Sequence, residues 1–178
     1  MQDFTNIYDK IYATDNSYNA KIDYKQDITL DWVKKNNLGE VLDVGCGRGH
    51  YLKMLSQNGI KVTGLEPSKV IANTLKDFEV INDDIIGLSK QGKRWPALIC
   101  MDVLEHIEPE AIETTLLALS GLADYSLLGI ANHNDKWQGT QLHLIQEKPD
   151  WWQQILSRYY NLQPLFESKR FFIFEAVS

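Results

Sequence analysis

Short apolar segments alternate with stretches of helical hydrophobic spacing from residue 38 to the end of the chain. Such alternation is typical of a parallel sheet that helices cover on both faces. We expect strands near residues 40–45, 61–66, 78–82, 97–102, 124–131, 161–167 and 170–177. The pattern therefore predicts an α/β fold with a doubly wound, mostly parallel sheet of about seven strands.

The last two apolar segments differ from the others because only the polar stretch from Glu167 to Arg170 separates them. A connection this short joins antiparallel strands, whereas a parallel pair needs a longer crossover. The run from Phe171 to Phe174 is too apolar for a strand that faces solvent. We therefore expect the sheet to end in a buried antiparallel hairpin.

Residues 1–37 lack this alternation and combine tyrosines, Tyr24 among them, with asparagine and aspartate. A helix near residues 25–36 is the element that their hydrophobic spacing predicts. A chain of 178 residues has about the length of one domain. We expect a single domain, residues 1–178, in which residues 38–178 form the core.

Composition and charge narrow the class of protein. The formal net charge of −6 argues against a generic nucleic-acid binder, whose affinity comes largely from Lys and Arg. No apolar run approaches the ~20 residues that span a bilayer, and the N-terminus lacks the pattern of a signal peptide. Cys46 and Cys100 follow neither disulfide nor metal-ligand spacing. We expect a cytoplasmic protein with no metal site, no membrane contact and no nucleic-acid partner; the sequence carries no signal for an oligomeric state.

Three glycines, Gly45, Gly47 and Gly49, fall between the first expected strand and a helix. Glycine permits left-handed turn conformations and places no Cβ atom between the backbone and a ligand. The first N–H groups of the following helix lack partners within the helix and favour an anionic group. The turn is therefore a candidate cradle for a nucleotide-containing cofactor.

Two acidic residues discriminate between the possible cofactors. Glu66 ends the second expected strand, where its two oxygens suit the hydroxyls of a ribose. Asp43 precedes the turn, and a carboxylate there disfavours a pyrophosphate but attracts an ammonium or sulfonium group. The NAD fingerprint G-x-G-x-x-G also places its last glycine one residue later than this chain does. The pattern therefore favours S-adenosylmethionine over NAD.

The segment from Asp43 to Gly49, followed by Glu66, resembles the class I S-adenosylmethionine-dependent methyltransferases, whose first motif is D-x-G-x-G-x-G. The resemblance extends from about Leu38 to about Ala131 and more loosely to the C-terminus. It implies a Rossmann-like fold, an antiparallel seventh strand and a segment 1–37 that folds over the cofactor as a lid. The residues that it implies as cofactor contacts are Asp43, Gly45, Cys46, Gly47, Gly49, Glu66 and Pro67.

Position within this family implies two further groups of cofactor contacts. Asp83 and Asp84 follow the third expected strand, where the family recognises adenine through a carboxylate and the next backbone N–H. The alternative is a solvated loop with two surface acids. Met101 and Asp102 follow the fourth strand and are expected beside the methionine part of the cofactor, with Leu104 near the adenosine.

The loop 131–150 follows the fifth expected strand, and ligands of open α/β sheets bind beyond the carboxyl ends of strands. Its polar and aromatic side chains suit a hydroxylated acceptor. The loop is similar to methyltransferase-like proteins of phage and surface-sugar gene clusters, which suggests a glycan or small-molecule acceptor. His143, His133 and His106 are candidates for a general base, with His143 preferred. Structural roles are the alternative, at a helix start for His106 and against Trp151 for His143.

Together these patterns predict methyl transfer from S-adenosylmethionine to a small molecule or glycan, with oxygen favoured as the acceptor atom. Two alternatives stay open. One is a protein that binds S-adenosylmethionine but has lost catalysis, and the other is an NAD-dependent oxidoreductase.

Overall fold

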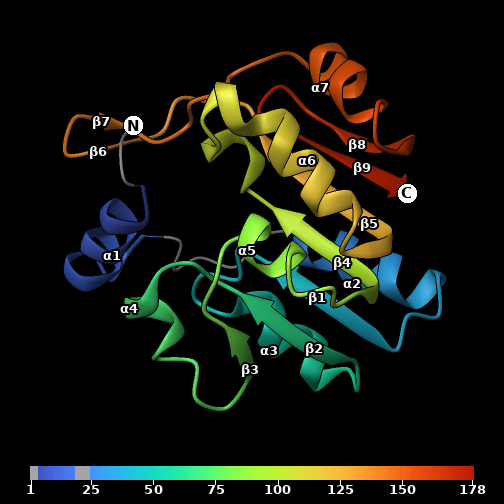
Figure 1. Ribbon diagram of the computed structural model, residues 1–178, viewed down its shortest axis with the longest axis horizontal. Helices are drawn as coiled ribbons and strands as arrows, with labels where there is room; N and C mark the ends of the chain where they lie inside the picture. Colours follow the sequence, from blue (N-terminus) through green and yellow to red (C-terminus); the bar gives the residue numbers. More distant parts are fainter. Residues whose placement is uncertain (1–3, 19–24) are drawn as a thin grey trace. The chain divides into compact units, whose positions relative to one another are not determined.

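The computed structural model describes residues 4–18 and 25–178 of the chain. The chain forms two compact units, residues 1–84 and residues 85–178, which are described separately (Figure 1). Tyr24, one of the tyrosines of the N-terminal segment, lies outside the described residues.

The first unit contains three parallel strands in the order β3-β2-β1. They are β1 (Glu40–Val44), β2 (Lys61–Leu65) and β3 (Glu79–Ile81). Val44 lies opposite Leu65 in the register of β1 and β2. Because both strands end at this pair, the glycine turn after β1 and Glu66 after β2 leave the sheet at the same edge.

Four helices accompany these strands: α1 (Phe4–Thr14), α2 (Lys25–Lys35), α3 (His50–Gln57) and α4 (Lys69–Ala72). The C-cap of α3 is Asn58, and α2 fills the range predicted for it. Ser68 caps the N-terminus of α4 by accepting a hydrogen bond from the Ile71 N–H. Helix α1 was not predicted, although it buries Ile11 and Tyr12.

The second unit contains four strands in the order β4-β5-β9-β8. Strand β4 (Trp95–Met101) runs parallel to β5 (Ala123–Ala131), and β9 (Phe171–Val177) runs antiparallel to both β5 and β8 (Asn161–Glu167). The run from Phe171 to Phe174 is buried. The predicted antiparallel C-terminal hairpin is confirmed.

Helical segments of the second unit follow the strands: α5 (Ile85–Ser89), η1 (Leu104–His106), η2 (Pro109–Ala111), α6 (Ile112–Ser120) and α7 (Pro149–Leu156). Figure 1 shows α6 running along the strands of this unit, and its Leu116 and Leu119 are fully buried. Residues 104–106 follow the carboxyl end of β4 after two intervening residues.

A short hairpin inside the loop 131–150 was not predicted. It pairs β6 (Lys136–Trp137) with β7 (Thr140–Gln141). The two linking residues, Gln138 and Gly139, have φ angles of 48° and 84°. Positive φ at both positions is the conformation that two-residue hairpin turns favour.

All seven strands expected from the sequence are present, mostly parallel and with an antiparallel pair at the C-terminus, so the predicted α/β, Rossmann-like fold is confirmed. The division into a lid of residues 1–37 and a core of residues 38–178 stays a prediction. Among the described residues, no helix combines the length and the apolar character needed to cross a bilayer.

Candidate active site

The glycine turn between β1 and α3 adopts backbone conformations that favour glycine. The φ angles of Gly45, Gly47 and Gly49 are 70°, 49° and 73°, all in the left-handed region. The N–H groups of Gly45 and Cys46 donate to the Leu65 carbonyl at 2.8 and 3.1 Å. These bonds fix the turn to the end of β2, beside Glu66.

Glu66 is braced by the backbone on both carboxylate oxygens. Its Oε2 accepts from the Gly47 N–H at 2.9 Å, and its Oε1 accepts from the Ser68 N–H at 2.8 Å. Burial raises the pKa of Glu66 to about 7, although these two hydrogen bonds act in the opposite direction. Each carboxylate oxygen has more than one acceptor site, so Glu66 keeps the capacity to accept from ligand hydroxyls.

Asp43 lies one residue before the end of β1 and is 1% exposed. Among the described residues, no group donates a hydrogen bond to its Oδ2. Burial, together with the charge of Glu66, raises the pKa of Asp43 to about 8. A buried carboxyl group without a donor is unfavourable, and a cationic ligand group at this position would compensate it.

The turn amides differ in one respect from the expected anion cradle. The Gly45, Cys46 and Gly47 N–H groups donate to Leu65 or Glu66, and the Gly49 N–H donates to the Cys46 carbonyl at 2.8 Å. These four amides therefore already donate hydrogen bonds within the protein. The Cys46 side chain packs against β2, since its Sγ would lie 2.7 Å from a Cβ atom on Gly64, and its contact with the cofactor stays a prediction.

Helix α1 lies against the same turn. The Arg48 Nε donates to the Tyr18 carbonyl at 2.7 Å, and its Nη2 donates to the Asp15 carbonyl at 2.8 Å. The Arg48 guanidinium also lies 5.3 Å from the centre of the Tyr12 ring. The Tyr12 hydroxyl would be 3.0 Å from a Cβ atom on Gly47, so a side chain there would disturb this packing.

A second connection joins α1 to the segment after Glu66. The Ser68 Oγ donates to the Asp9 Oδ1 at 2.5 Å, and the Val70 N–H donates to the same oxygen at 3.2 Å. Neither Asp9 nor Arg48 was predicted as a site residue. The pairings join residues 30 or more positions apart, which explains why local patterns did not reveal them.

The residues proposed to recognise adenine follow β3. The Asp84 N–H donates to the Asp83 Oδ1 at 2.9 Å, so the amide expected to face adenine is engaged within the loop. The Asn82 side-chain amide donates to the carbonyls of Glu66 and Pro67 at 2.8 and 3.0 Å. The loop after β3 is thus tied to the loop after β2, and the adenine contacts stay a prediction.

In the second unit, Asp102 directly follows β4 with a φ of 57°, a left-handed conformation that aspartate tolerates better than most residues. Its N–H donates to the Gly129 carbonyl at 3.0 Å, which holds this conformation in place. Met101 is buried and Leu104 is fully buried in the core. The roles predicted for these three residues toward the cofactor stay predictions.

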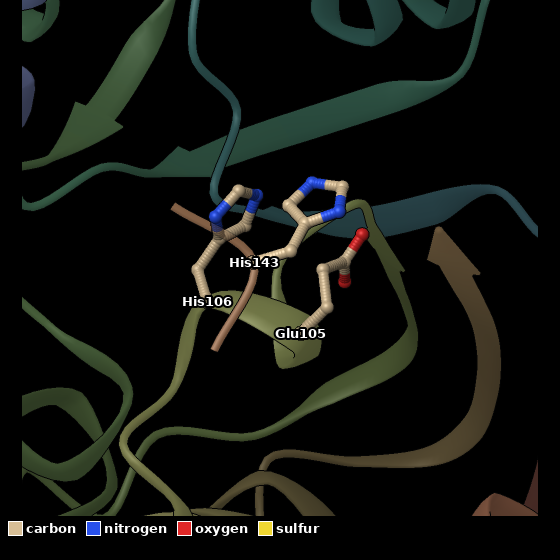
Figure 2. Close-up of side chains that lie close together, drawn as sticks. All are labelled: Glu105, His106 and His143. Atoms are coloured by element: carbon tan, nitrogen blue, oxygen red, sulfur yellow. The ribbon is translucent and has the colours of Figure 1, made fainter. Parts of the chain in front are cut away.

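Two of the candidate histidines meet a glutamate that the sequence analysis did not single out. Figure 2 shows the side chains of Glu105, His106 and His143 converging. One possible ligand atom from each residue lies within 4.8 Å of the others. The ring centres of His106 and His143 are 4.7 Å apart, and the ring of His133 lies 4.7 Å from that of His143.

Backbone carbonyls fix the orientation of both converging histidines. The Nδ1 of His106 is 3.0 Å from the Leu142 carbonyl, and the Nδ1 of His143 is 2.6 Å from the His133 carbonyl. A carbonyl oxygen only accepts, so each Nδ1 carries the hydrogen. Burial lowers the pKa of His106 to about 3 and also lowers that of His143. Both rings are therefore neutral near pH 7, with the lone pair on Nε2.

Glu105 is fully buried and links three segments of this unit. Its Oε1 accepts from the Ala131 N–H at 2.8 Å, at the end of β5. Its backbone carbonyl accepts from the N–H groups of Leu144 and Ile145 at 2.7 and 3.0 Å. These bonds hold the segment around His143 against η1.

The sequence of this chain matches the model of a known protein family. Residues 18–163 match the family model described as a methyltransferase domain. An uncharacterized methyltransferase of Alkaliphilus oremlandii is 25% identical over 142 residues, which cover 71% of this chain and 65% of that protein. A ubiquinone biosynthesis O-methyltransferase of Coxiella burnetii is 33% identical over 88 residues, which cover 44% of this chain and 38% of that protein. The chain thus spans less than two thirds of the length of these curated relatives.

Solved structures share the fold at low sequence identity. A magnesium protoporphyrin IX methyltransferase from Synechocystis, crystallised with bound SAM, matches with a TM-score of 0.74 and 18% identity over 99% of this chain and 98% of that chain. A 1,6-didemethyltoxoflavin-N1-methyltransferase of Burkholderia thailandensis matches with a TM-score of 0.72 and 14% identity over 98% and 87%. The match to the family model covers most of the chain, so the resemblance seen in the sequence is confirmed: the chain belongs to the methyltransferase domain family.

Proposed function

We propose that this chain is an S-adenosylmethionine-dependent methyltransferase that methylates a hydroxyl oxygen of a small molecule, saccharides included. The observation that carries the proposal is the pair of buried carboxyl groups, Asp43 and Glu66, at the carboxyl ends of adjacent strands beside a glycine turn. The Oδ2 of Asp43 lacks a donor among the described residues, and Glu66 accepts hydrogen bonds from two backbone N–H groups.

The two carboxyl groups fit different parts of S-adenosylmethionine. We assign the ammonium group to Asp43, since a cation beside it would offset the cost of burying its charge. We assign the ribose hydroxyls to Glu66, whose orientation the Gly47 and Ser68 N–H groups already fix. The named solved neighbour from Synechocystis, crystallised with bound SAM, supports this choice of donor.

Two observations support oxygen as the acceptor atom. The relative from Coxiella burnetii is named an O-methyltransferase. The side chains of Glu105, His106 and His143 offer oxygen and nitrogen atoms beyond the carboxyl ends of β4 and β5, where open α/β folds bind their ligands. Polar groups of this kind suit a hydroxylated acceptor better than an apolar one.

The bound donor supplies a methyl group that forms a C–O bond with the acceptor while the electrons of its C–S bond stay on sulfur and the hydroxyl proton is released. Charge disappears in such a step, so the protein contributes mainly by alignment. Asp43 and Glu66 hold the donor at its amino-acid and ribose groups. The loop 131–150 holds the acceptor.

Turnover with a labelled methyl donor tests the proposal. The full chain is incubated with methyl-labelled S-adenosylmethionine and a panel of monosaccharides, simple phenols and aliphatic amines. We expect label in O-methyl products of at least one hydroxylated compound. Label confined to the amines would contradict O-methylation, and S-adenosylhomocysteine binding without any transfer would favour the binding protein that has lost catalysis.

A further inference from the structure

The side chains of Glu105, His106 and His143 form a set of metal-binding type inside the second unit (Figure 2). Two imidazoles and one carboxylate recur as the protein ligands of catalytic zinc and of non-haem iron, where open coordination positions receive water or substrate. Magnesium and calcium prefer oxygen ligands alone. The donor set therefore selects a divalent transition metal.

Each histidine of the cluster has its Nδ1 bonded to a backbone carbonyl, as metal-binding histidines commonly do. Histidine ligands almost always donate their other ring N–H to a carbonyl, a carboxylate or water, which fixes the tautomer and aims the ring. Here the Leu142 carbonyl accepts from the Nδ1 of His106, and the His133 carbonyl accepts from the Nδ1 of His143. Nε2 is thus the ring nitrogen of each histidine that a metal ion would bind, and the Nε2 of His143 also lies 3.8 Å from the Asp135 Oδ2.

Hydrogen bonds also fix Glu105, the third possible ligand, and the segment that carries His143. The Oε1 of Glu105 accepts from the Ala131 N–H at 2.8 Å, so the carboxylate plane is set by strand β5. The carbonyl of His143 accepts from the side-chain amides of Gln141 and Gln146 at 2.9 and 3.1 Å. Backbone and side-chain bonds therefore fix the segment that carries His143 on both sides.

The distances require only a modest contraction. Metal–nitrogen bonds of ~2.1 Å place tetrahedral ligand atoms about 3.4 Å apart. The ligand atoms of the cluster lie within 4.8 Å of one another. Metal binding would therefore draw the three side chains together by up to about 1.4 Å.

We propose that Glu105, His106 and His143 bind one divalent transition-metal ion, and that this ion binds the hydroxyl oxygen of the methyl acceptor. The second part rests on the proposed function, whereas metal binding does not. No metal site was predicted from the sequence, because His106 and His143 are 37 residues apart and show no ligand spacing.

The proposal changes the role of His143. A nitrogen whose lone pair binds a metal does not also accept the acceptor proton, so His143 is a ligand rather than the general base. Binding to the ion acidifies the hydroxyl group, as it does water. The proton leaves to solvent, the oxygen forms the new C–O bond, and the electrons of the broken C–S bond stay on sulfur.

Cobalt binding to the full chain tests the metal site. The protein is dialysed against a chelator and then titrated with Co²⁺, whose visible absorption reports nitrogen and oxygen coordination, and Zn²⁺ is added as a competitor. We expect saturation at one Co²⁺ per chain and displacement by Zn²⁺. No saturable binding near this ratio would overturn the proposal.

Matched variants locate the site. Glu105→Gln and His143→Gln should each weaken Co²⁺ binding by more than about 100-fold, since loss of even an outer-shell partner costs up to that factor. His50→Gln removes one of the other histidines and should leave the affinity unchanged. Unchanged affinity in His143→Gln, or equal loss in His50→Gln, would overturn the assignment.

Nitrogen NMR of the wild-type histidine rings provides a test that does not depend on the folding of a variant. Zn²⁺ should shift the Nε2 signals of His106 and His143 and leave those of His50 unchanged. Shifts confined to other histidines would contradict the proposal.

Measurements of methyl transfer distinguish metal binding from the proposed role of the ion toward the acceptor. Methyl transfer to a hydroxylated acceptor should fall at least 10-fold after chelation and return when Zn²⁺ or Co²⁺ is added. Equal rates with and without metal would overturn the role of the ion toward the acceptor. Metal binding without any binding of S-adenosylhomocysteine would instead overturn the proposed function and leave the metal site standing.

Discussion

At the scale of residues, Glu66 and Asp43 are buried acids in different surroundings. Glu66 accepts backbone hydrogen bonds on both oxygens, whereas the Oδ2 of Asp43 has no donor among the described residues. Glu66 is thus positioned before a ligand arrives. A ligand ammonium group would supply the donor that the Oδ2 of Asp43 lacks among the described residues.

Replacing Glu66 by alanine should weaken S-adenosylhomocysteine binding by about 1–3 kcal/mol, because charged hydrogen bonds to the ribose are lost. The exposed Glu79, at the start of β3, provides the control, and Glu79→Ala should bind as the wild type does. Isothermal titration calorimetry measures both. Equal affinity in the two variants would remove Glu66 from the site.

Asp43 should make stability depend on pH in a defined direction. Its pKa is raised to about 8 in the folded chain, so between pH 4 and pH 8 the folded state holds the proton more tightly than the unfolded state. The stability that Asp43 contributes is therefore present at low pH and is lost as the pH rises, by up to about 1.4 kcal/mol per pH unit.

Urea unfolding of the wild type and of Asp43→Asn, from pH 5 to pH 8, isolates this effect. The free energy of unfolding of the wild type minus that of the variant should fall as the pH increases. A difference that stays constant, or that grows, would contradict the raised pKa of Asp43.

At the scale of elements, strand β2 must approach the glycine turn closely. A Cβ atom on Gly64 would lie 2.7 Å from the Cys46 Sγ and 3.2 Å from the Leu52 Cδ1. Gly64→Ala should therefore lower the free energy of unfolding by about 1–3 kcal/mol. Gly39→Ala is the control, since nothing lies within 4 Å of a Cβ atom there. Chemical denaturation giving equal stability for both variants would contradict the packing of β2 against the turn.

Arg48 makes two long-range hydrogen bonds to the segment that directly follows helix α1. Arg48→Ala removes the bonds to the carbonyls of Tyr18 and Asp15 and the contact with the Tyr12 ring. Amide hydrogen exchange in residues 4–18 should then become faster, by a factor of ten or more for about 1.4 kcal/mol lost.

Arg158→Ala is a suitable comparison for this experiment, since Arg158 pairs with Glu113 on the exposed surface. Exchange in residues 4–18 should not change in that variant. Exchange that is unchanged in Arg48→Ala as well would show that α1 is held by other contacts.

At the scale of the whole molecule, the strands were predictable because burial leaves a strong apolar signal. The segment Trp95–Met101 is almost continuously buried, and the expected strand at residues 97–102 overlaps it closely. The hairpin of β6 and β7 was missed because its paired residues are mostly polar, although Gln138-Gly139 is a recognisable turn. Helix α1 was missed because its tyrosines are interspersed with polar residues.

The candidate site was only partly predictable, because some of its residues lie in local motifs and others meet only through the fold. Asp43, the glycines and Glu66 lie in local motifs, so spacing alone identified them. Glu105 lies beside His106 in the sequence, but its meeting with His143 depends on how the loop after β5 returns to η1. Such a contact between distant segments leaves no periodic pattern.

The central claim is that the glycine turn, Asp43 and Glu66 bind S-adenosylmethionine. Thermal unfolding of the full chain with S-adenosylhomocysteine, and separately with NAD, tests it most directly. S-adenosylhomocysteine at one hundred times its dissociation constant should stabilise the protein by about 2.7 kcal/mol, while NAD should leave the unfolding temperature unchanged. Stabilisation by NAD alone, or no response to S-adenosylhomocysteine or S-adenosylmethionine, would contradict the claim.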